Sequence, residues 1–209
     1  DNLNGHCIEV NSEKNDVSVS NIIIDSEWGF YVRCIKRSHD LLQIGTQLWM
    51  AENLNVNCFR NGDIIQEAKT KNEWINASEK GMPAWCYYLN NYDNANKYGK
   101  LYNWYALNDK RGLCPDGYRI PKVKDFAILY RELKTIQNYN DLLLLLFRIY
   151  PTGSRYPDGT FCDKKRRFAG FWCIPKYNVI HYIFNNRKAC GLFFDFENVD
   201  IISGNWRPI

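Results

Sequence analysis

Eight cysteines and three histidines are the residues of this 209-residue chain that could support redox, metal or nucleophilic chemistry. The cysteines stand far apart in sequence, without the paired CxxC spacing that structural zinc sites use. The histidines, His6, His39 and His181, are scattered and have no serine or cysteine nucleophile motif near them. The sequence therefore predicts no metal site, no cofactor and no catalytic residues, and we expect a protein that is not an enzyme.

The number and spacing of the cysteines fit disulfides instead. An even number of well-separated cysteines, together with many aromatic residues, is typical of proteins in an oxidising compartment. Cys162 and Cys173 flank the basic run Lys164–Arg167, which we interpret as the solvated tip of a hairpin, so these two cysteines could bridge its strands. Several pairings remain open for the other residues, and those without an assigned partner at this point include Cys7, Cys58, Cys86 and Cys190.

Aromatic side chains are the best candidates for contacting a ligand. Tyrosine and tryptophan combine a large apolar face with a polar edge, which suits stacking on sugar rings or anchoring protein interfaces. A polar loop after Phe171–Cys173 adds amide and basic side chains of the kind that binding loops present. The predicted contact residues are Trp85, Tyr88, Lys176, Tyr177, Asn178, Asn185 and Arg187. The same aromatic types also build cores.

Composition and charge limit the class of protein. With 45% apolar and 15% aromatic residues, a chain of this length can bury roughly 70% of its unfolded surface, and we expect one domain over residues 1–209. A net charge of +4 is mild, which argues against a nucleic-acid partner. Apolar stretches stay well below the roughly 20 residues that cross a bilayer, so we expect no membrane insertion.

The order of the predicted elements indicates an α+β fold. The first forty residues read as β structure, and residues 41–50 read as the next strand after a polar turn at 37–40. These two strands should pair antiparallel, with Cys34 beside the segment that leads into Trp49. Residues 58–96 carry signals for turns and short strands.

Helices are expected mainly in the centre of the chain. Apolar spacing predicts a short aromatic helix over 101–107, a clearer amphipathic helix after Pro121 and a second short helix over 142–147. Strands and turns return beyond Pro151. Strands, then central helices, then strands again is an α+β pattern.

Three segments carry a family resemblance: residues 44–55 (IGTQLWMAENLN), 98–109 (YGKLYNWYALND) and 112–121 (GLCPDGYRIP). Together they resemble the Fibrobacter succinogenes major paralogous domain, a family of secreted bacterial modules related to C-type-lectin-like folds and to the formylglycine-generating enzymes. The resemblance implies a C-type-lectin-like fold with mixed, mostly antiparallel sheets and two or three short helices. It also implies a secreted or cell-surface location.

The family's closing strand stands at the front of this chain. Members end on a strand of the form Gly-Phe-Ser-Val-Arg-Cys-Val, and the matching segment here is 29–35 (GFYVRCI). We therefore expect a circularly permuted domain in which residues 27–36 supply the closing strand, since re-joining is tolerated where termini lie close together. The resemblance further implies a disulfide between Cys34 and Cys114. It also implies a packing role for Trp49, Trp104 and Trp172, which stand inside family motifs.

A weak internal repeat relates residues 6–20 to 189–203. Both copies resemble the family's penultimate strand, so they compete for one place in the sheet. The front copy is either a remnant of a preceding repeat or an added strand that protects an edge. If residues 27–36 did not fold back, they would complete a neighbouring repeat or a strand-swapped copy.

These observations favour a non-catalytic recognition module of a secreted or cell-surface bacterial protein, with a glycan or a protein as its partner. Calcium-dependent lectin runs such as Glu-Pro-Asn and Trp-Asn-Asp are missing from the sequence, and Asn108-Asp109 is interpreted as a structural turn. One alternative is a structural subunit of a surface appendage that assembles by strand exchange. Another is a formylglycine-generating-like thiol oxidase, for which Cys173 and Cys190 are the nearest candidates although a structural role suits them better.

Overall fold

The structure is a computed structural model of the whole chain. It describes residues 7–11, 16–20, 27–36, 42–134, 150, 153–162, 168–174, 190–195 and 201–202. These residues form short strands in mixed sheets with four short α-helices, so the predicted α+β class is confirmed. Among them, no helix is long and apolar enough to span a membrane.

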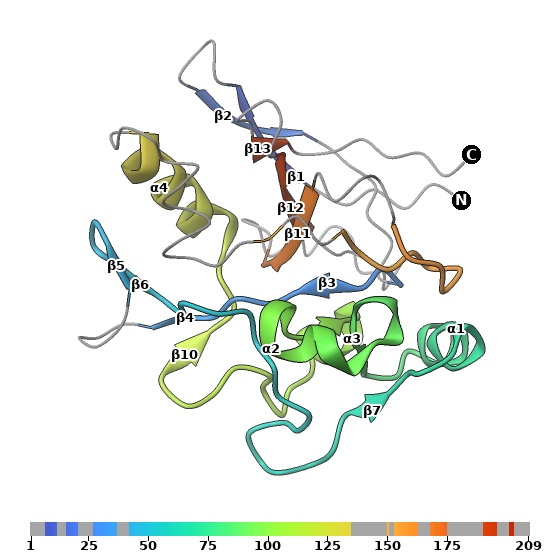
Figure 1. The fold of residues 1–209 in the computed structure, drawn as a ribbon. Helices are drawn as coiled ribbons and strands as arrows, with labels where there is room; N and C mark the ends of the chain where they lie inside the picture. The colour runs from blue at the N-terminus through green and yellow to red at the C-terminus, as the bar shows by residue number, and fades with distance from the viewer. Residues whose placement is uncertain are drawn as a thin grey trace, which may run out of the picture.

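A seven-stranded mixed sheet forms the centre (Figure 1). In spatial order its strands are β13 (Ile201–Ile202), β12 (Cys190–Asp195), β11 (Phe168–Cys173), β3 (Phe30–Tyr31), β9 (Leu101–Tyr102), β8 (Ala84–Cys86) and β7 (Gln66–Glu67). The β11–β3 and β7–β8 pairs are parallel and the other pairs are antiparallel. The predicted mixed, mostly antiparallel arrangement is therefore correct.

Both faces of this sheet are buried at its central strands β3, β9 and β8. Strand alternation places Tyr31, Leu101 and Phe171 in one hydrophobic cluster, and Phe30 and Tyr102 in another. Trp49 and Trp172 are fully buried and Trp104 is nearly so, which confirms their predicted packing role. The first cluster also contains apolar residues of α1 and α4, so the helices cover that face.

The predicted closing strand folds back onto its own chain. A four-stranded sheet has the order β10 (Tyr118–Arg119), β4 (Ile35–Lys36), β6 (Gln47–Trp49) and β5 (Leu42–Ile44). Ile35 pairs with Trp49 in antiparallel register, and the Met50 amide donates to the Cys34 carbonyl at 3.1 Å. The expected neighbours of the Cys34 strand are thus confirmed.

The single strand expected over residues 41–50 is wrong in detail. The chain turns back at Gly45, where φ is +54°, so that β5 and β6 form a hairpin instead. A positive φ is readily adopted by glycine, and the sequence around it gave no stronger turn signal.

Four α-helices lie in the described residues: α1 (Lys71–Glu79), α2 (Ala95–Tyr98), α3 (Trp104–Leu107) and α4 (Val123–Lys134). The helix expected after Pro121 is confirmed as α4. The helix expected over 101–107 is half right, because its first residues form β9 and only 104–107 are helical. The helix expected over 142–147 lies outside the described residues.

Helix α1 was missed by the expectation of turns and short strands over 58–96. It begins with a capping box, in which the Thr70 hydroxyl accepts from the Glu73 amide and the Glu73 carboxylate accepts from the Thr70 amide. Thr-x-x-Glu is a sequence-level start signal, but the modest amphipathicity of the following residues hid it.

The two repeat copies both form antiparallel strand pairs. β1 (Cys7–Asn11) pairs with β2 (Asp16–Ser20), and β12 pairs with β13. The first pair is a separate two-stranded sheet that lies beside β13 and β12 (Figure 1). The front copy therefore packs beside the end of the central sheet without joining it, and the choice between a remnant of a preceding repeat and an added edge strand stays open.

Candidate functional site

Two of the predicted ligand contacts lie in the core. Trp85 is 6% exposed, and its indole N–H donates to the Ile65 carbonyl at 2.9 Å. Tyr88 is 4% exposed, and its hydroxyl donates to the Cys162 carbonyl at 3.2 Å. Neither ring presents a face to a ligand here, so their expected contact role is corrected to a packing role. The other predicted contacts, Lys176, Tyr177, Asn178, Asn185 and Arg187, lie outside the described residues.

A disulfide fixes the closing strand to the segment before α4. Cys34 and Cys114 are bonded, with their Cα atoms 6.1 Å apart and 80 residues between them in sequence. Both cysteines are buried in the same hydrophobic cluster as Phe30 and Trp172. The pairing implied by the family resemblance is thus confirmed.

The expected Cys162–Cys173 bond is not formed. Cys162 is a free thiol whose sulfur accepts a hydrogen bond from the Tyr156 hydroxyl at 3.3 Å. The physical reason is the strand order, because β11, which carries Cys173, pairs with β12 and β3 rather than with the segment around Cys162. Cys173 lies opposite Cys190 in that register.

Two of the described thiols, Cys86 and Cys173, are poorly suited to nucleophilic chemistry. Burial raises the pKa of Cys86 to about 11, against the opposing effect of the nearby Arg155 guanidinium. Cys173 is fully buried. A reactive thiol needs partial exposure and a lowered pKa, so this environment favours structural roles for both residues.

A buried hydrogen-bond network joins Arg33, Asn53 and the Tyr98 carbonyl. Arg33 is only 2% exposed, and its Nε and Nη2 donate to Oδ1 of Asn53 at 3.1 and 2.6 Å. The Asn53 amide nitrogen in turn donates to the Tyr98 carbonyl at 2.9 Å. Burial lowers the pKa of Arg33 to about 9 while Glu52 raises it, so the guanidinium is still charged at neutral pH. One amide therefore joins the closing strand, the 51–55 segment and α2.

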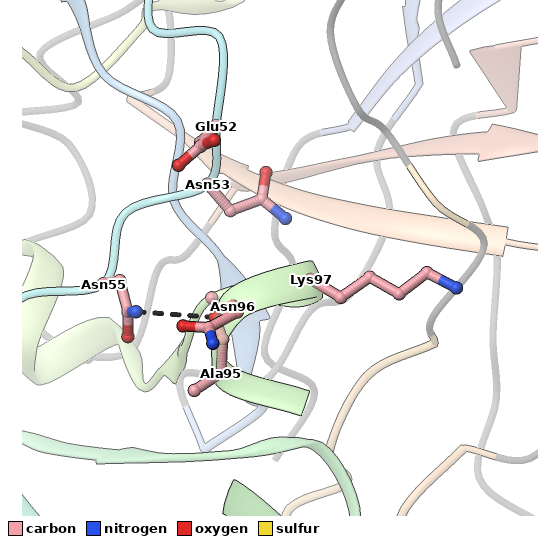
Figure 2. Close-up of a pocket in the computed structure, with 7 residues that line it drawn as sticks. Glu52, Asn53, Asn55, Ala95, Asn96 and Lys97 are labelled. Carbon is pink, nitrogen blue, oxygen red and sulfur yellow. Dashed lines mark hydrogen bonds between the residues drawn. The ribbon is translucent and has the colours of Figure 1, made fainter. Parts of the chain in front are cut away.

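A polar hollow of about 90 Å³ opens beside Asn53 (Figure 2). Glu52, Asn55 and Asn96 are exposed at its rim, and the Asn55 amide donates to the Ala95 carbonyl at 3.4 Å. Lys97 also lines it, but its side chain points away from Glu52 and lies over the Tyr150 ring at 4.9 Å. The hollow offers carboxylate and amide groups, without an aromatic ring among the residues that line it.

A second, wider groove of about 340 Å³ lies between the 81–83 segment and α3. Trp104 and Tyr105 supply an aromatic wall, and residues 108–110 supply an amide, a carboxylate and an ammonium group. Sequence reasoning missed both hollows. Their residues stand within or beside the family segments, but a motif match does not tell which side chains face inward.

An exposed tyrosine extends from the core beside Trp85. Tyr92 is 73% exposed and packs edge-to-face on Tyr87, with ring centroids 5.4 Å apart. Tyr87 packs on Trp85 at 5.2 Å, and the buried Lys100 ammonium lies 4.1 Å from the Trp85 ring. Burial lowers the pKa of Lys100, against the nearby Glu67 carboxylate. These ring–ring and cation–π contacts hold Tyr92 in place at the surface.

Metal binding finds no support in the described part of the chain, which has no group of three or more histidine, cysteine, aspartate or glutamate residues placed to hold an ion. The family model of the Fibrobacter succinogenes major domain matches residues 42–143 of this chain. Comparison with curated proteins and with solved structures found no match. Residues 27–36 and 153–174 lie outside the matched range, yet they provide Arg33, Cys34 and Arg155 to the buried framework.

Proposed function

Since the chain belongs to the Fibrobacter succinogenes major domain family through residues 42–143, we propose that it is a non-catalytic recognition module of a secreted or cell-surface bacterial protein. Its partner is a glycan or a protein surface. The proposal includes a single C-type-lectin-like domain, permuted so that residues 27–36 close the sheet. The strand pairing of Ile35 with Trp49 and the Cys34–Cys114 bond support that arrangement.

One observation carries the proposal: polar side chains of the family-matched region fall into two sets. Some are hydrogen-bonded inside the protein, and others are exposed at the hollows. Inside the protein, Asn53 accepts hydrogen bonds from Arg33, and Asn103 accepts from backbone amides around α3. Glu52, Asn96 and Asn108 are exposed at the hollows. A rigid scaffold that presents polar side chains around a concave surface is the usual design of a binding site.

The buried disulfide supports the location. Such bonds form and persist in oxidising compartments and are rare in the reducing cytosol. The bond closes an 80-residue separation, so it constrains a large part of the chain. A module that works outside the cell gains stability from such a link without depending on a cofactor.

A glycan array tests the proposal. We expect the purified chain to bind a restricted set of glycans saturably, and we expect EDTA to leave that binding unchanged, because the described residues hold no calcium-type ligand set. A copper-dependent oxidation of peptide thiols would support the oxidase instead and overturn the non-catalytic proposal. Loss of all binding on chelation would overturn the calcium-independent mode.

Assembly by strand exchange is the second candidate, and the paired repeat copies favour it. β1–β2 lies beside β12–β13, so a hairpin of similar sequence is available to replace β12 in a neighbouring copy. Light scattering after size exclusion tests this candidate. Concentration-dependent oligomers that vanish when residues 1–20 are deleted would support exchange. A monomer at all concentrations would rule it out in favour of the self-contained module.

A further inference from the structure

The groove beside α3 has walls that are fixed to each other. Asn103 is fully buried, and its Oδ1 accepts from the Ala84 and Ala106 amides at 3.0 Å each. Its Nδ2 donates to the Met82 carbonyl at 2.8 Å. One amide therefore ties the 82–84 segment to the first turn of α3, and the groove between them is pre-organised. Pre-organised sites bind more tightly because less freedom is lost on binding.

The apolar part of the groove is an aromatic wall. Tyr105 is half-buried, and Trp104 beside it is 8% exposed. The Tyr105 ring passes close to Gly81, where a Cβ atom would lie 3.4 Å from its Cε1. A glycine at this position, with φ at +64°, keeps that side of the groove free of side-chain atoms.

The polar part contains a carboxylate that is held in a fixed orientation. Oδ1 of Asp109 accepts from Nε and from the backbone N–H of Arg111 at 2.9 Å each, and Oδ2 accepts from Nη2 at 2.8 Å. These hydrogen bonds lower the pKa of Asp109, so it stays ionised. Since a carboxylate offers about four acceptor positions, about one remains on Oδ2. Exposed Asn108 and Lys110 add donors on the same side.

We propose that this groove binds a pyranose ring of a neutral glycan, with Tyr105 stacking on the ring and Asp109, Asn108 and Lys110 bonding its hydroxyl groups. The inference deepens the proposed function and rests on it. A sugar ring has an apolar face and a polar edge. The groove matches both, because one part of its lining is aromatic and the other part is polar. The volume of about 340 Å³ falls within the usual range of roughly 300–1,000 Å³ for small-ligand sites.

A protein partner fits this groove less well. Protein interfaces bury about 800 Å² on each side and depend on exposed aromatic anchors. Trp104 exposes only 8% of its surface, which leaves Tyr105 as the main accessible ring. The polar hollow of Figure 2, which has no aromatic lining, serves as the internal control.

Chemical-shift mapping tests the inference with defined probes. The ¹⁵N-labelled protein is titrated with the methyl glycosides of glucose, galactose, mannose and N-acetylglucosamine. We expect saturable shifts at Tyr105, Asn108 and Lys110 for at least one of them, and no shifts at Asn96. Tyr105→Ala should weaken the binding at least about tenfold, because the stacking ring is lost, while Tyr105→Phe should stay within about threefold. Asn72→Ala, at an exposed position of α1 outside both hollows, is the control and should leave it unchanged.

Each outcome decides one question. Thermal unfolding of every variant shows whether it is folded. If Tyr105→Ala does not fold, the shift map of the wild-type protein still tests the inference. Shifts centred on Asn96, with binding lost in Asn96→Ala but kept in Tyr105→Ala, would overturn this inference and leave the proposed function standing. If the array shows saturable glycan binding but no glycoside shifts the groove, only the inference fails. Failure of both the array and the titration would sink the glycan-binding function itself.

Discussion

Two buried arginines hold two parts of this molecule in different ways. Arg33 sends two of its hydrogen bonds to a single atom, Oδ1 of Asn53. Arg155 is fully buried between the rings of Trp74 and Phe161 and donates to the backbone carbonyls of Ala68, Thr70 and Gly159 at 2.8, 2.9 and 3.1 Å.

The two arginines differ in whether a single substitution can remove their hydrogen-bond acceptors. A side-chain acceptor disappears with one substitution, whereas a backbone carbonyl remains whatever residue carries it. The Arg33 region lies beneath the polar hollow and is also closed by the disulfide, while Arg155 ties the 153–162 segment to the start of α1. We therefore expect the region under the hollow to respond more sharply to single substitutions.

Removal of the disulfide should have the largest effect. In the chain-entropy model, a loop of 80 residues contributes roughly 4–5 kcal/mol, so the Cys34→Ala/Cys114→Ala variant should lose about that free energy of unfolding. Urea unfolding followed by tryptophan fluorescence measures it. Cys58→Ser, at a half-buried free thiol, is the control and should change stability little. An unfolding midpoint unaffected by dithiothreitol would contradict the expected role of the bond.

The contrast between the two arginines is tested by removing one amide from each. Asn53→Ala removes the oxygen that accepts two hydrogen bonds from the buried Arg33 cation, and we expect the free energy of unfolding to fall by about 3 kcal/mol. Asn90 contacts Arg155 only at 3.4 Å and has a positive φ of 53°, so Asn90→Gly keeps the backbone conformation and should cost less than about 0.5 kcal/mol. Equal losses in chemical denaturation would show that the two regions do not differ in this way.

Much of this framework could be predicted from the sequence, but the exposed sites could not. The Cys34 strand, its neighbour at Trp49 and α4 follow from alternation and helical periodicity together with the family segments. Those signals report burial, so they correctly placed Trp49 and Trp172 inside. They failed at Trp85 and Tyr88, because an aromatic residue in a short strand gives no sign of whether its ring meets solvent or core.

Long-range partners explain the other differences. The Cys162–Cys173 expectation assumed that neighbours in sequence pair in space, but β11 pairs with β12 and with the distant β3. The groove beside α3 depends on Asn103 joining two segments about twenty residues apart, and no local pattern encodes such a contact. Arg155 was not singled out for the same reason, since its acceptors are backbone carbonyls, which every residue carries.

A third arginine extends the comparison to a partner with opposite charge. Arg119, about one-third exposed, makes a bidentate ion pair with Asp125, which also accepts from the Lys122 amide at 2.6 Å. Burial alone would raise the pKa of Asp125, but these bonds outweigh it and lower the pKa. Asp125→Asn should therefore cost about 1–2 kcal/mol at pH 7, discounted for the exposure of Arg119.

The pH dependence of this pair has a definite sign. Because the pKa of Asp125 is lowered by folding, its contribution is fully present above the unfolded pKa of about 4 and is lost as the pH falls through the lower, folded value. Unfolding curves of wild type and Asp125→Asn should differ at pH 7 and converge as the pH drops below about 4. A difference that stays constant down to pH 2 would mean that packing, not ionisation, explains the loss.

The smallest expected effect separates a helix cap from the Arg155 cluster that it adjoins. Thr70→Ala removes the hydroxyl that accepts from the Glu73 amide, and loss of such a cap costs about 1 kcal/mol. Thr70→Ser keeps an acceptor and should cost little. The Thr70 carbonyl that accepts from Arg155 is unchanged in both variants, so the loss should add to that of Arg155→Met in a double-mutant cycle. A coupling above about 0.5 kcal/mol would show instead that the start of α1 and the buried cation act as one unit, and the backbone-held arginine would then be as vulnerable to a single side chain as Arg33.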